Sequence, residues 1–189
     1  MARYGKDHKQ ATRQRIVETA GRRLKRDGID GSGVATLMAD AGLTNGAFYA
    51  HFDSKEDLVS TAVTDQLREQ RERYSTQSLG IVRGYLSPQH RDDTEGGCPS
   101  AALLDEIARS SDAVKRAYTD GQLAIIDDAA ARLAPDDPRS ARAKTLSVFA
   151  LMVGTLQISR ALADQTLADE VLEQGIQNAL ALVGAEHQG

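Results

Sequence analysis

The sequence predicts an all-α protein, and three observations lead to this fold class. Alanine and leucine are abundant, whereas aromatic residues make up only 4% of the 189 residues and there are four prolines. Such a composition favours helices over sheets. Apolar residues recur at helical spacing along most of the chain, and no segment alternates polar and apolar residues as a strand would. We expect about nine helices, divided into a small three-helix unit (residues 1–54) and a larger helical body (residues 55–189).

The first expected helix spans about residues 9–26 and ends at Asp27-Gly28. Its inner stripe consists of Ile16, Val17, Ala20 and Leu24. Residues 1–26 hold nine Lys or Arg residues against Asp7 and Glu18, although the whole chain has a net charge of −4. A basic end on an acidic body is typical of a nucleic-acid-binding end on a soluble protein. The alternative is a charged helix that is simply solvated.

Residues 34–52 follow a helix–turn–short-helix pattern. The first of these helices has an apolar face made by Val34, Leu37, Met38 and Ala41. Gly42 suits the turn, and Thr44 is a good N-cap for the next helix. We expect that short helix to pack Ala47 or Phe48, together with Phe52, inward. Two short helices joined by a glycine-containing turn form a helix-turn-helix, whose second helix enters the DNA major groove.

At this point the sequence resembles a known family over about residues 10–58. The run that carries the resemblance is Ala-Gly-Leu-Thr-Asn-Gly-Ala-Phe-Tyr-Ala-His-Phe-Asp-Ser-Lys-Glu-Asp-Leu, residues 41–58. It is similar to the signature of the tetracycline-repressor (TetR-type) family of bacterial transcription regulators. The rest of the chain agrees with that family in length and helical texture. One departure is Gly33, where the family usually carries a capping Ser or Thr, and we expect Ser32 to substitute for it.

Residues in and around the second short helix are the candidates for DNA contact. Hydroxyl groups and a lysine suit phosphates, polar side chains suit base edges, and small residues allow close approach. The resemblance implies similar roles at the matching positions. The candidates are Thr36, Thr44, Asn45, Gly46, Ala47, Tyr49, His51 and Lys55. For His51, a hydrogen bond at the helix end is the alternative to a DNA role.

The body is expected to begin with a long helix and to continue through four or five more. Ser54 is the predicted N-cap of the long helix, with Asp57 at the capping-box position. An apolar piece, a polar loop and a break at Pro135–Pro138 separate the later helices. The expected segments are a helix from about Lys55 to Tyr74, an apolar piece Leu79–Leu86, a loop Pro88–Gly97, and helices at about Pro99–Ser110, Asp112–Leu133, Arg139–Ala163 and Leu167–Val183.

The resemblance implies that the middle helices enclose a pocket for an unknown small-molecule effector. The candidate lining residues are Leu67, Tyr74, Tyr85, Cys98, Leu103, Ile107, Tyr118 and Ile125. Ordinary core packing is the alternative for the apolar members. Cys98 is expected at a helix N-cap, with Pro99 at the first helical position. A helix N-terminus favours a reactive thiolate, whereas nearby acidic residues oppose it. We hypothesise that Cys98 helps to sense an electrophile, with a structural helix start as the alternative.

The last two helices are the candidates for a homodimer interface. One helix-turn-helix unit buries too little DNA surface for tight specific binding, and two units on a palindrome solve this. Gly154 and Gly175 lie in mid-helix, where glycine costs about 1 kcal/mol relative to alanine, and close helix approach would explain them. The resemblance implies a four-helix bundle across the two-fold axis, with a monomer core as the alternative. The candidates are Leu151, Gly154, Ile158, Leu172, Gly175, Ile176 and Leu180.

The sequence therefore predicts a cytoplasmic, dimeric, sequence-specific DNA-binding regulator. The resemblance implies that it is a repressor, which a small-molecule or electrophilic effector releases from a palindromic operator. A non-specific architectural DNA-binding protein is the alternative. An enzyme is not expected, because no third group orients the pair Cys98 and His90. The single cysteine excludes an intrachain disulfide and a cysteine-rich metal site, and no cofactor is expected. The longest apolar run, Thr145–Ser159, is too short for a membrane span, and no secretory signal is evident.

Overall fold

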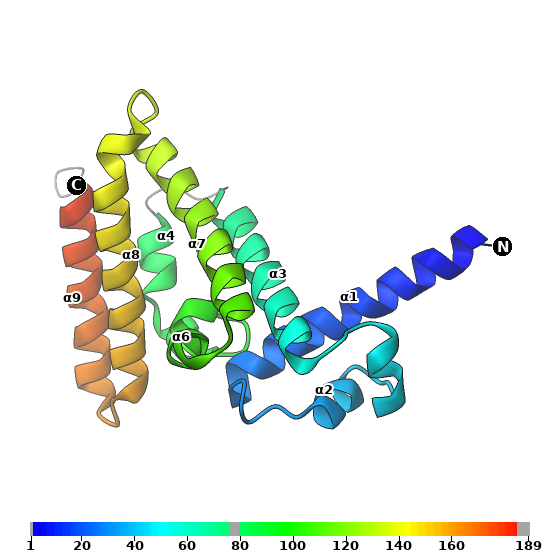
Figure 1. Cartoon of the computed structure of the whole chain (residues 1–189). Coiled ribbons are helices and arrows are strands. Elements are labelled where there is room, and N and C mark those ends of the chain that lie inside the picture. Colours follow the sequence, from blue (N-terminus) through cyan, green and yellow to red (C-terminus); the bar gives the residue numbers. More distant parts are fainter. Residues whose placement is uncertain (1, 76–79, 185–189) are drawn as a thin grey trace.

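The computed structural model describes residues 2–75 and 80–184, and it confirms an all-helical chain (Figure 1). Within those residues there are nine α-helices and one 3-10 helix, η1. The elements are α1 (Ala2–Asp27), α2 (Val34–Asp40), η1 (Asn45–Ala50), α3 (Lys55–Ser75), α4 (Gly80–Tyr85), α5 (Pro88–Asp92), α6 (Pro99–Arg109), α7 (Asp112–Leu133), α8 (Pro138–Ala161) and α9 (Gln165–Val183). Leu79, where the expected apolar piece begins, lies outside the described residues.

The N-terminal unit is built around the second half of α1. Its predicted stripe is buried, with Ile16, Ala20 and Leu24 fully inaccessible to solvent. Leu37 and Met38 from α2 and Phe48 from η1 belong to the same core cluster. The first half of α1 projects away from the rest of the chain, as Figure 1 shows. The unit therefore presents α1 and η1 at one end of the molecule.

The long helix α3 connects this unit to the body. The predicted cap is present, because the Asp57 N–H donates to Ser54 Oγ at 3.1 Å and the Asp57 carboxylate accepts from the Asp53 N–H at 3.2 Å. Farther along, α3 lies against α7 at a glycine. A Cβ on Gly121 would lie 2.8 Å from the Cβ of Leu67, so only glycine permits this approach. One hydrophobic core runs without a break from α1 and α2 into α3, α6 and α7.

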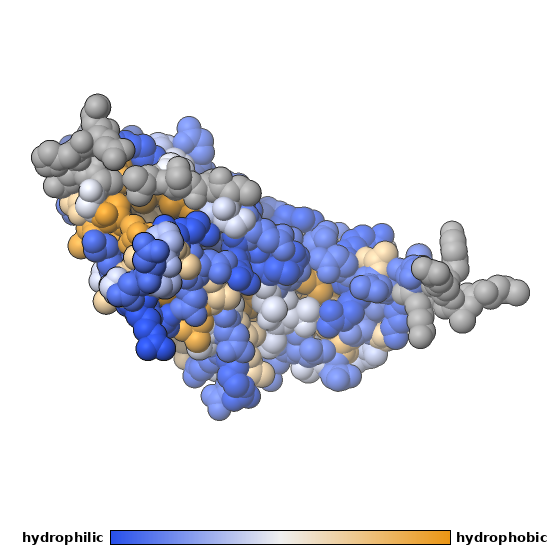
Figure 2. Space-filling model, turned by 90° about the horizontal axis from the view of Figure 1, so that it is seen from above, coloured by the Kyte–Doolittle hydropathy of each residue, from blue (hydrophilic) through white to orange (hydrophobic). Residues whose placement is uncertain are grey.

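Helices α8 and α9 pair at the opposite end of the molecule. A Cβ on Gly175 would meet Thr155 Cγ2 at 2.5 Å, so the expected close helix approach occurs here, within the chain. Leu172, Gly175 and Ile176 are consequently buried between α9 and its neighbours, which corrects their assignment to a surface that faces a partner. A Cβ on Gly154 would meet no atom within 4 Å. Figure 2 shows hydrophobic surface gathered at this end, whereas the opposite end is largely hydrophilic.

Three local expectations are wrong in detail. The segment expected as a loop contains α5, because Pro88 starts a helix that Ser87 caps by accepting the His90 N–H at 3.2 Å. Ser32 does not cap α2, since its hydroxyl donates to Gly28 O at 2.7 Å and leaves Gly33 as a bare N-cap. The sequence also suggests Asp112 as the cap of the helix that ends at Leu133, but the N-cap of α7 is Ser111.

Gly121→Ala is expected to lower the free energy of unfolding by about 1–3 kcal/mol, because the new methyl group overpacks the contact with Leu67. Chemical denaturation measures the change. The matched control is Gly84→Ala in α4, where a Cβ meets nothing within 4 Å and the helical preference of alanine adds up to about 1 kcal/mol. Equal stability of the two variants would contradict the close packing of α3 on α7.

Candidate nucleic-acid interface and effector pocket

Two buried phenylalanines fix the orientation of η1. Phe48 and Phe52 are 1% and 2% exposed, and their rings stack with centroids 5.8 Å apart. Because these side chains anchor one face of the turn, the other face is presented to solvent. Thr44, Asn45 and Gly46 are exposed there, and Tyr49 is 74% exposed. The Phe48 and Tyr49 rings meet edge to face, which gives the exposed tyrosine a defined position.

The other candidates for DNA contact differ in how exposed their side chains are. Thr36 is exposed on α2, whereas Ala47 and His51 are half-buried. The Nδ1 atom of His51 is buried and has no hydrogen-bond partner in the part of the chain that the structure describes. Burial together with Lys9 and Arg13 lowers the pKa of this imidazole. Lys55 Nζ donates to Ile29 O at 2.6 Å, at the turn that follows α1. Because an ammonium group has three N–H donors, Lys55 can keep this internal bond and still contact a phosphate, so its DNA role stays a prediction.

Basic residues of α1 lie beside η1 and were not among the candidates. The Arg13 guanidinium lies 4.6 Å from the centre of the Phe52 ring and donates to Thr61 Oγ1 at 3.4 Å. Lys9 is exposed and close enough to His51 to lower the pKa of the imidazole. The basic composition of residues 1–26 indicated this charge, but its position beside η1 depends on how α1 packs. The surface made by η1 and the neighbouring part of α1 is therefore both polar and basic.

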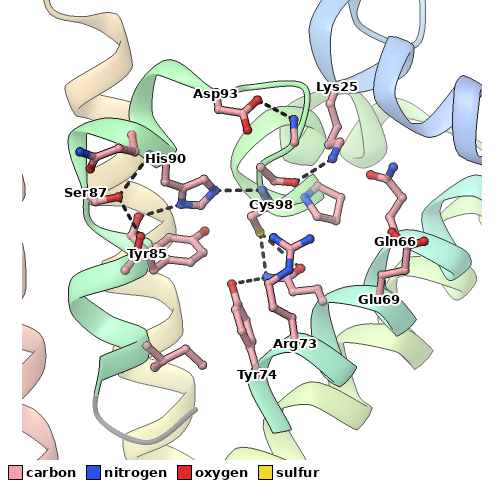
Figure 3. Close-up of a pocket in the computed structure, with 17 residues that line it drawn as sticks. Lys25, Gln66, Glu69, Arg73, Tyr74, Tyr85, Ser87, His90, Asp93 and Cys98 are labelled. Carbon is pink, nitrogen blue, oxygen red and sulfur yellow. Dashed lines mark hydrogen bonds between the residues drawn. The ribbon is translucent and has the colours of Figure 1, made fainter. Parts of the chain in front are cut away.

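A cavity of about 300 Å³ lies in the body, between the end of α1, the second half of α3, α4, α5 and the loop before α6 (Figure 3). Tyr74, Tyr85 and Cys98 line it, as expected. The other five candidates do not line it, because their helices turn them into the first hydrophobic core instead. Leu67, Leu103, Ile107 and Ile125 are buried there, and Tyr118 packs against it while its hydroxyl donates to Ser100 Oγ at 3.0 Å.

Cys98 is the N-cap of α6, as predicted, and its side chain points into this cavity. The residue is 3% exposed. Gln70 from α3 donates to Cys98 Sγ at 3.2 Å and to the hydroxyl of Tyr74 at 2.7 Å. Burial raises the pKa of Tyr74 and of Tyr85. The hydroxyl of Tyr85 is buried and has no hydrogen-bond partner among the described residues.

His90 holds the loop that leads to Cys98. Its Nδ1 lies 2.7 Å from Tyr85 O, and its Nε2 lies 3.0 Å from the Cys98 backbone nitrogen. A carbonyl needs a donor and an N–H needs an acceptor, so the imidazole is neutral with its proton on Nδ1. Burial lowers the pKa of His90, in agreement with this state. Because His90 bonds the main chain of Cys98 rather than its sulfur, its role here is to position the loop.

Lys25 connects the N-terminal unit to the same loop. Its ammonium group donates to Gly97 O at 2.8 Å, and the residue is only 7% exposed. Burial lowers the pKa of Lys25 from 10.5 to about 8. Arg22 and Arg26, on the exposed side of the same helix end, lie 4.0 Å and 3.5 Å from the Glu95 carboxylate. Lys25 is one of the nine basic residues in residues 1–26, and nothing near it in the sequence indicates this contact.

A second contact between the two parts lies at the first turn after α1. The Glu106 carboxylate of α6 accepts the Ile29 N–H, beside a smaller cavity of about 260 Å³. Helix α6 thus touches the N-terminal unit at both ends, through Gly97 before its start and through Glu106 near its end. A shift of α6 would consequently be transmitted to α1.

Within residues 2–75 and 80–184 there is no cluster of three or more metal-ligating side chains. None of the helices in the same part of the chain is long and apolar enough to cross a membrane.

Comparison with known proteins agrees with this geometry. Residues 16–62 match the model of the bacterial regulatory proteins, tetR family. The HTH-type transcriptional regulator TtgR of Pseudomonas putida is 39% identical over 69 residues, which are 36% of this chain and 32% of TtgR. AcrR of Shigella flexneri is 40% identical over 60 residues, 32% of this chain and 28% of AcrR. The matched segment therefore spans about a third of the length of these relatives.

Solved structures extend the likeness to nearly the whole chain. The reduced form of Escherichia coli NemR superposes with a TM-score of 0.75 at 19% identity, and the match covers 89% of this chain and 95% of NemR. FadR of Bacillus subtilis in complex with stearoyl-CoA gives a TM-score of 0.63 at 14% identity, covering 92% and 99%. These likenesses show the fold of a helix-turn-helix unit joined to a helical body. Residues 16–62 are thus similar to the tetR family of bacterial regulatory proteins, and nearly the whole chain has the fold of these solved structures.

The lowered pKa of His90 predicts a pH dependence of stability. The unfolded chain binds a proton at about pH 6.5, where the folded chain does not, so the free energy of unfolding should fall as the pH drops below about 6.5. His90→Phe removes this contribution and flattens the slope, although the loss of two hydrogen bonds lowers stability by about 1–3 kcal/mol at neutral pH. Urea denaturation between about pH 5 and pH 7.5 measures both. His51 contributes with the same sign in both proteins, so an unchanged slope in the variant would contradict the neutral state of His90.

Proposed function

We propose that the protein is a sequence-specific DNA-binding transcriptional regulator that acts as a dimer. The observation that carries this proposal is the exposed face of η1, which presents Thr44, Asn45 and Tyr49 on a turn anchored by two buried phenylalanines. Side chains of these types suit phosphates and base edges in the major groove. The basic residues of α1 beside this face add attraction for the DNA backbone. The similarity of residues 16–62 to the tetR family supports the same function.

Selection of genomic fragments by the purified protein at about 150 mM salt tests this function. A short palindrome should be enriched, since two units related by a two-fold axis read two half-sites. Sequence-independent retention with a steep salt dependence would instead support the non-specific architectural alternative and contradict the proposal.

Two variants sharpen the same selection. Asn45→Ala should change the enriched sequence at one position of each half-site, because its amide is proposed to reach a base edge. Tyr49→Phe should weaken binding to all selected sequences alike by about tenfold or less, because its hydroxyl is proposed to reach a phosphate. If neither variant alters binding, this face of η1 is not the contact surface.

The outer face of α8 and α9 is the proposed dimer interface. Ile158 is 55% exposed, Leu146 and Leu167 are each 43% exposed, and Gly154 leaves open space above the helix. Leu151 and Leu180 are half-buried at the edge of this face. Exposed apolar surface of this kind is typical of a subunit interface. With Leu172, Gly175 and Ile176 buried inside the chain, α8 contributes more of the proposed interface than α9.

Ile158→Asp should convert the dimer into a monomer, because it buries an unpaired charge at the centre of the interface. Sedimentation velocity measures the mass, and operator affinity should fall with it. Leu104→Asp on α6 is the matched control, since Leu104 is also exposed, at 37%, but lies on another helix. A dimeric Ile158→Asp protein would contradict this interface.

The pocket around Cys98 is the proposed effector site, and repression relieved by an effector is the proposed mode of regulation. An effector that changes the loop from Asp93 to Cys98 would act on α1 through the Lys25–Gly97 hydrogen bond. Dimers that differ in this contact would then differ in the spacing of their two η1 faces.

Direct reaction of Cys98 with an electrophile is one form that this effector could take. The thiol lines the cavity although it is only 3% exposed, so a reagent must enter the pocket to reach it. Electrophile treatment should release operator DNA from the wild-type protein and not from Cys98→Ser, as measured by fluorescence anisotropy. Normal release from Cys98→Ser would exclude this form of sensing and leave reversible ligand binding in the same pocket.

A further inference from the structure

The ammonium group of Lys25 is buried without a compensating carboxylate. It lines the cavity, and its hydrogen-bond acceptor is the carbonyl of Gly97 at 2.8 Å. In the part of the chain that the structure describes, no carboxylate oxygen lies within 4.0 Å of Lys25 Nζ. Buried charges in proteins are ordinarily paired, because desolvation disfavours an isolated ion. The lowered pKa of Lys25 reflects the same deficit.

A second cation stands at the same end of the cavity. Arg73 of α3 lines the cavity and lies close enough to Lys25 to lower the pKa of its ammonium group further. Two carboxylates also belong to the wall. Asp93 accepts the Gly96 N–H at 2.7 Å and so closes its own loop, and Glu69 is exposed on the surface of α3. Arg73 is exposed on α3 as well, so Lys25 is the buried charge at this wall with which an anion would pair.

One side of the remaining wall is apolar and aromatic, whereas glutamine, serine and histidine side chains line much of the rest. Tyr74, Ile81 and Tyr85 form the apolar side, from the end of α3 and from α4. In the described part of the chain the buried hydroxyl of Tyr85, which lies near the Cys98 side chain, has no partner within hydrogen-bond distance, so it is available to bond a polar atom of a ligand. Figure 3 shows Tyr74 and Tyr85 on the side of the cavity away from Lys25. A volume of about 300 Å³ suits a single aromatic ring with a short side chain.

We propose that this pocket binds a small aromatic monocarboxylate, with its carboxylate group between Lys25 and Arg73 and its ring against Tyr74, Ile81 and Tyr85. This proposal names the chemical class of the effector. It rests on the proposed function only in so far as the ligand is called an effector. Since Lys25 belongs to α1, the ligand contacts the DNA-binding unit itself. Because an ammonium group has three N–H donors, a carboxylate at Lys25 can share it with Gly97 O and thereby change the geometry of the link between α1 and the loop.

Calorimetric titration of the full-length protein with three acids and their amides tests the ligand class. The pairs are benzoate and benzamide, phenylacetate and phenylacetamide, and 3-phenylpropionate and 3-phenylpropionamide. The carboxylate of at least one pair should bind about tenfold more tightly than its amide, because only the anion pairs with Lys25. Absence of binding by all three carboxylates, or equal binding of each acid and its amide, would overturn the proposal.

Lys25→Met should abolish the preference for the carboxylate, whereas Lys115→Met, at an exposed lysine of α7, should keep it. Thermal unfolding of both variants shows whether each is folded, and the comparison of acid with amide in the wild-type protein needs no variant. A preference that survives in folded Lys25→Met would overturn the role of Lys25.

Proton uptake on ligand binding distinguishes a lysine that pairs with the ligand from a lysine that has only a structural role. At about pH 8 the bound carboxylate should draw a proton onto Lys25, which calorimetry in two buffers of different ionisation enthalpy detects. The charged or titratable groups that face Lys25 are Cys98, Arg73, Asp93 and Glu69. Uptake should vanish in Lys25→Met, and its absence from the wild-type protein would contradict pairing with Lys25.

None of these measurements involves DNA. If a carboxylate binds but no operator is selected, the ligand site is supported and the proposed regulator function is contradicted. If an operator is selected but no carboxylate binds, the regulator function is supported and the ligand class is contradicted.

Discussion

The hydrogen bond from Lys25 Nζ to Gly97 O joins the last turn of α1 to the loop that starts α6. It is made by a side chain that is 7% exposed, so solvent does not compete for either partner. The Arg22 and Arg26 pairs with Glu95 surround it on the exposed side, and the bond from Ile29 N–H to Glu106 repeats the connection at the other end of α6. The orientation of the N-terminal unit on the body depends on these contacts.

The packing of the two hydrophobic cores connects these contacts between α1 and α6 to the other helices of the molecule. One hydrophobic cluster runs from α1 through α3 to α6 and α7, and the close contact at Gly121 fixes α3 against α7. A second cluster holds α4, α8 and α9 and contains Cys98 and Tyr85. The pocket therefore lies where the two cores meet, beside the end of α1. A ligand at this position contacts both the element that carries the proposed nucleic-acid surface and the helices next to the proposed dimer face.

The sequence predicted those features that depend on neighbouring residues. The spacing of Phe48 and Phe52 determines which face of η1 is buried, and Ser54 with Asp57 marks the start of α3. Cys98 and Pro99 likewise mark the start of α6. Each of these signals lies within a few positions of the structure it produces, so no knowledge of the tertiary fold was needed.

Features that depend on distant residues could not be predicted in the same way. Lys25 and Gly97 are 72 residues apart, and nothing near either residue indicates their contact. Leu67 and Ile125 have the helical spacing of pocket residues, but the packing of α3 on α7 turns them into the core. The same reasoning applies to Lys55, whose ammonium group donates to Ile29 O.

Hydrogen–deuterium exchange of wild-type and Lys25→Met proteins tests the central claim most directly, because it requires neither effector nor operator. If the Lys25–Gly97 bond couples the pocket loop to the N-terminal unit, the variant should exchange faster at two places. These are the amides of residues 95–98 and those at the end of α1, about residues 20–28, including Gly28, whose N–H donates to Leu24 O at 2.8 Å. Faster exchange confined to the loop, with α1 unchanged, would show that the loop moves independently of the DNA-binding unit and would contradict the account.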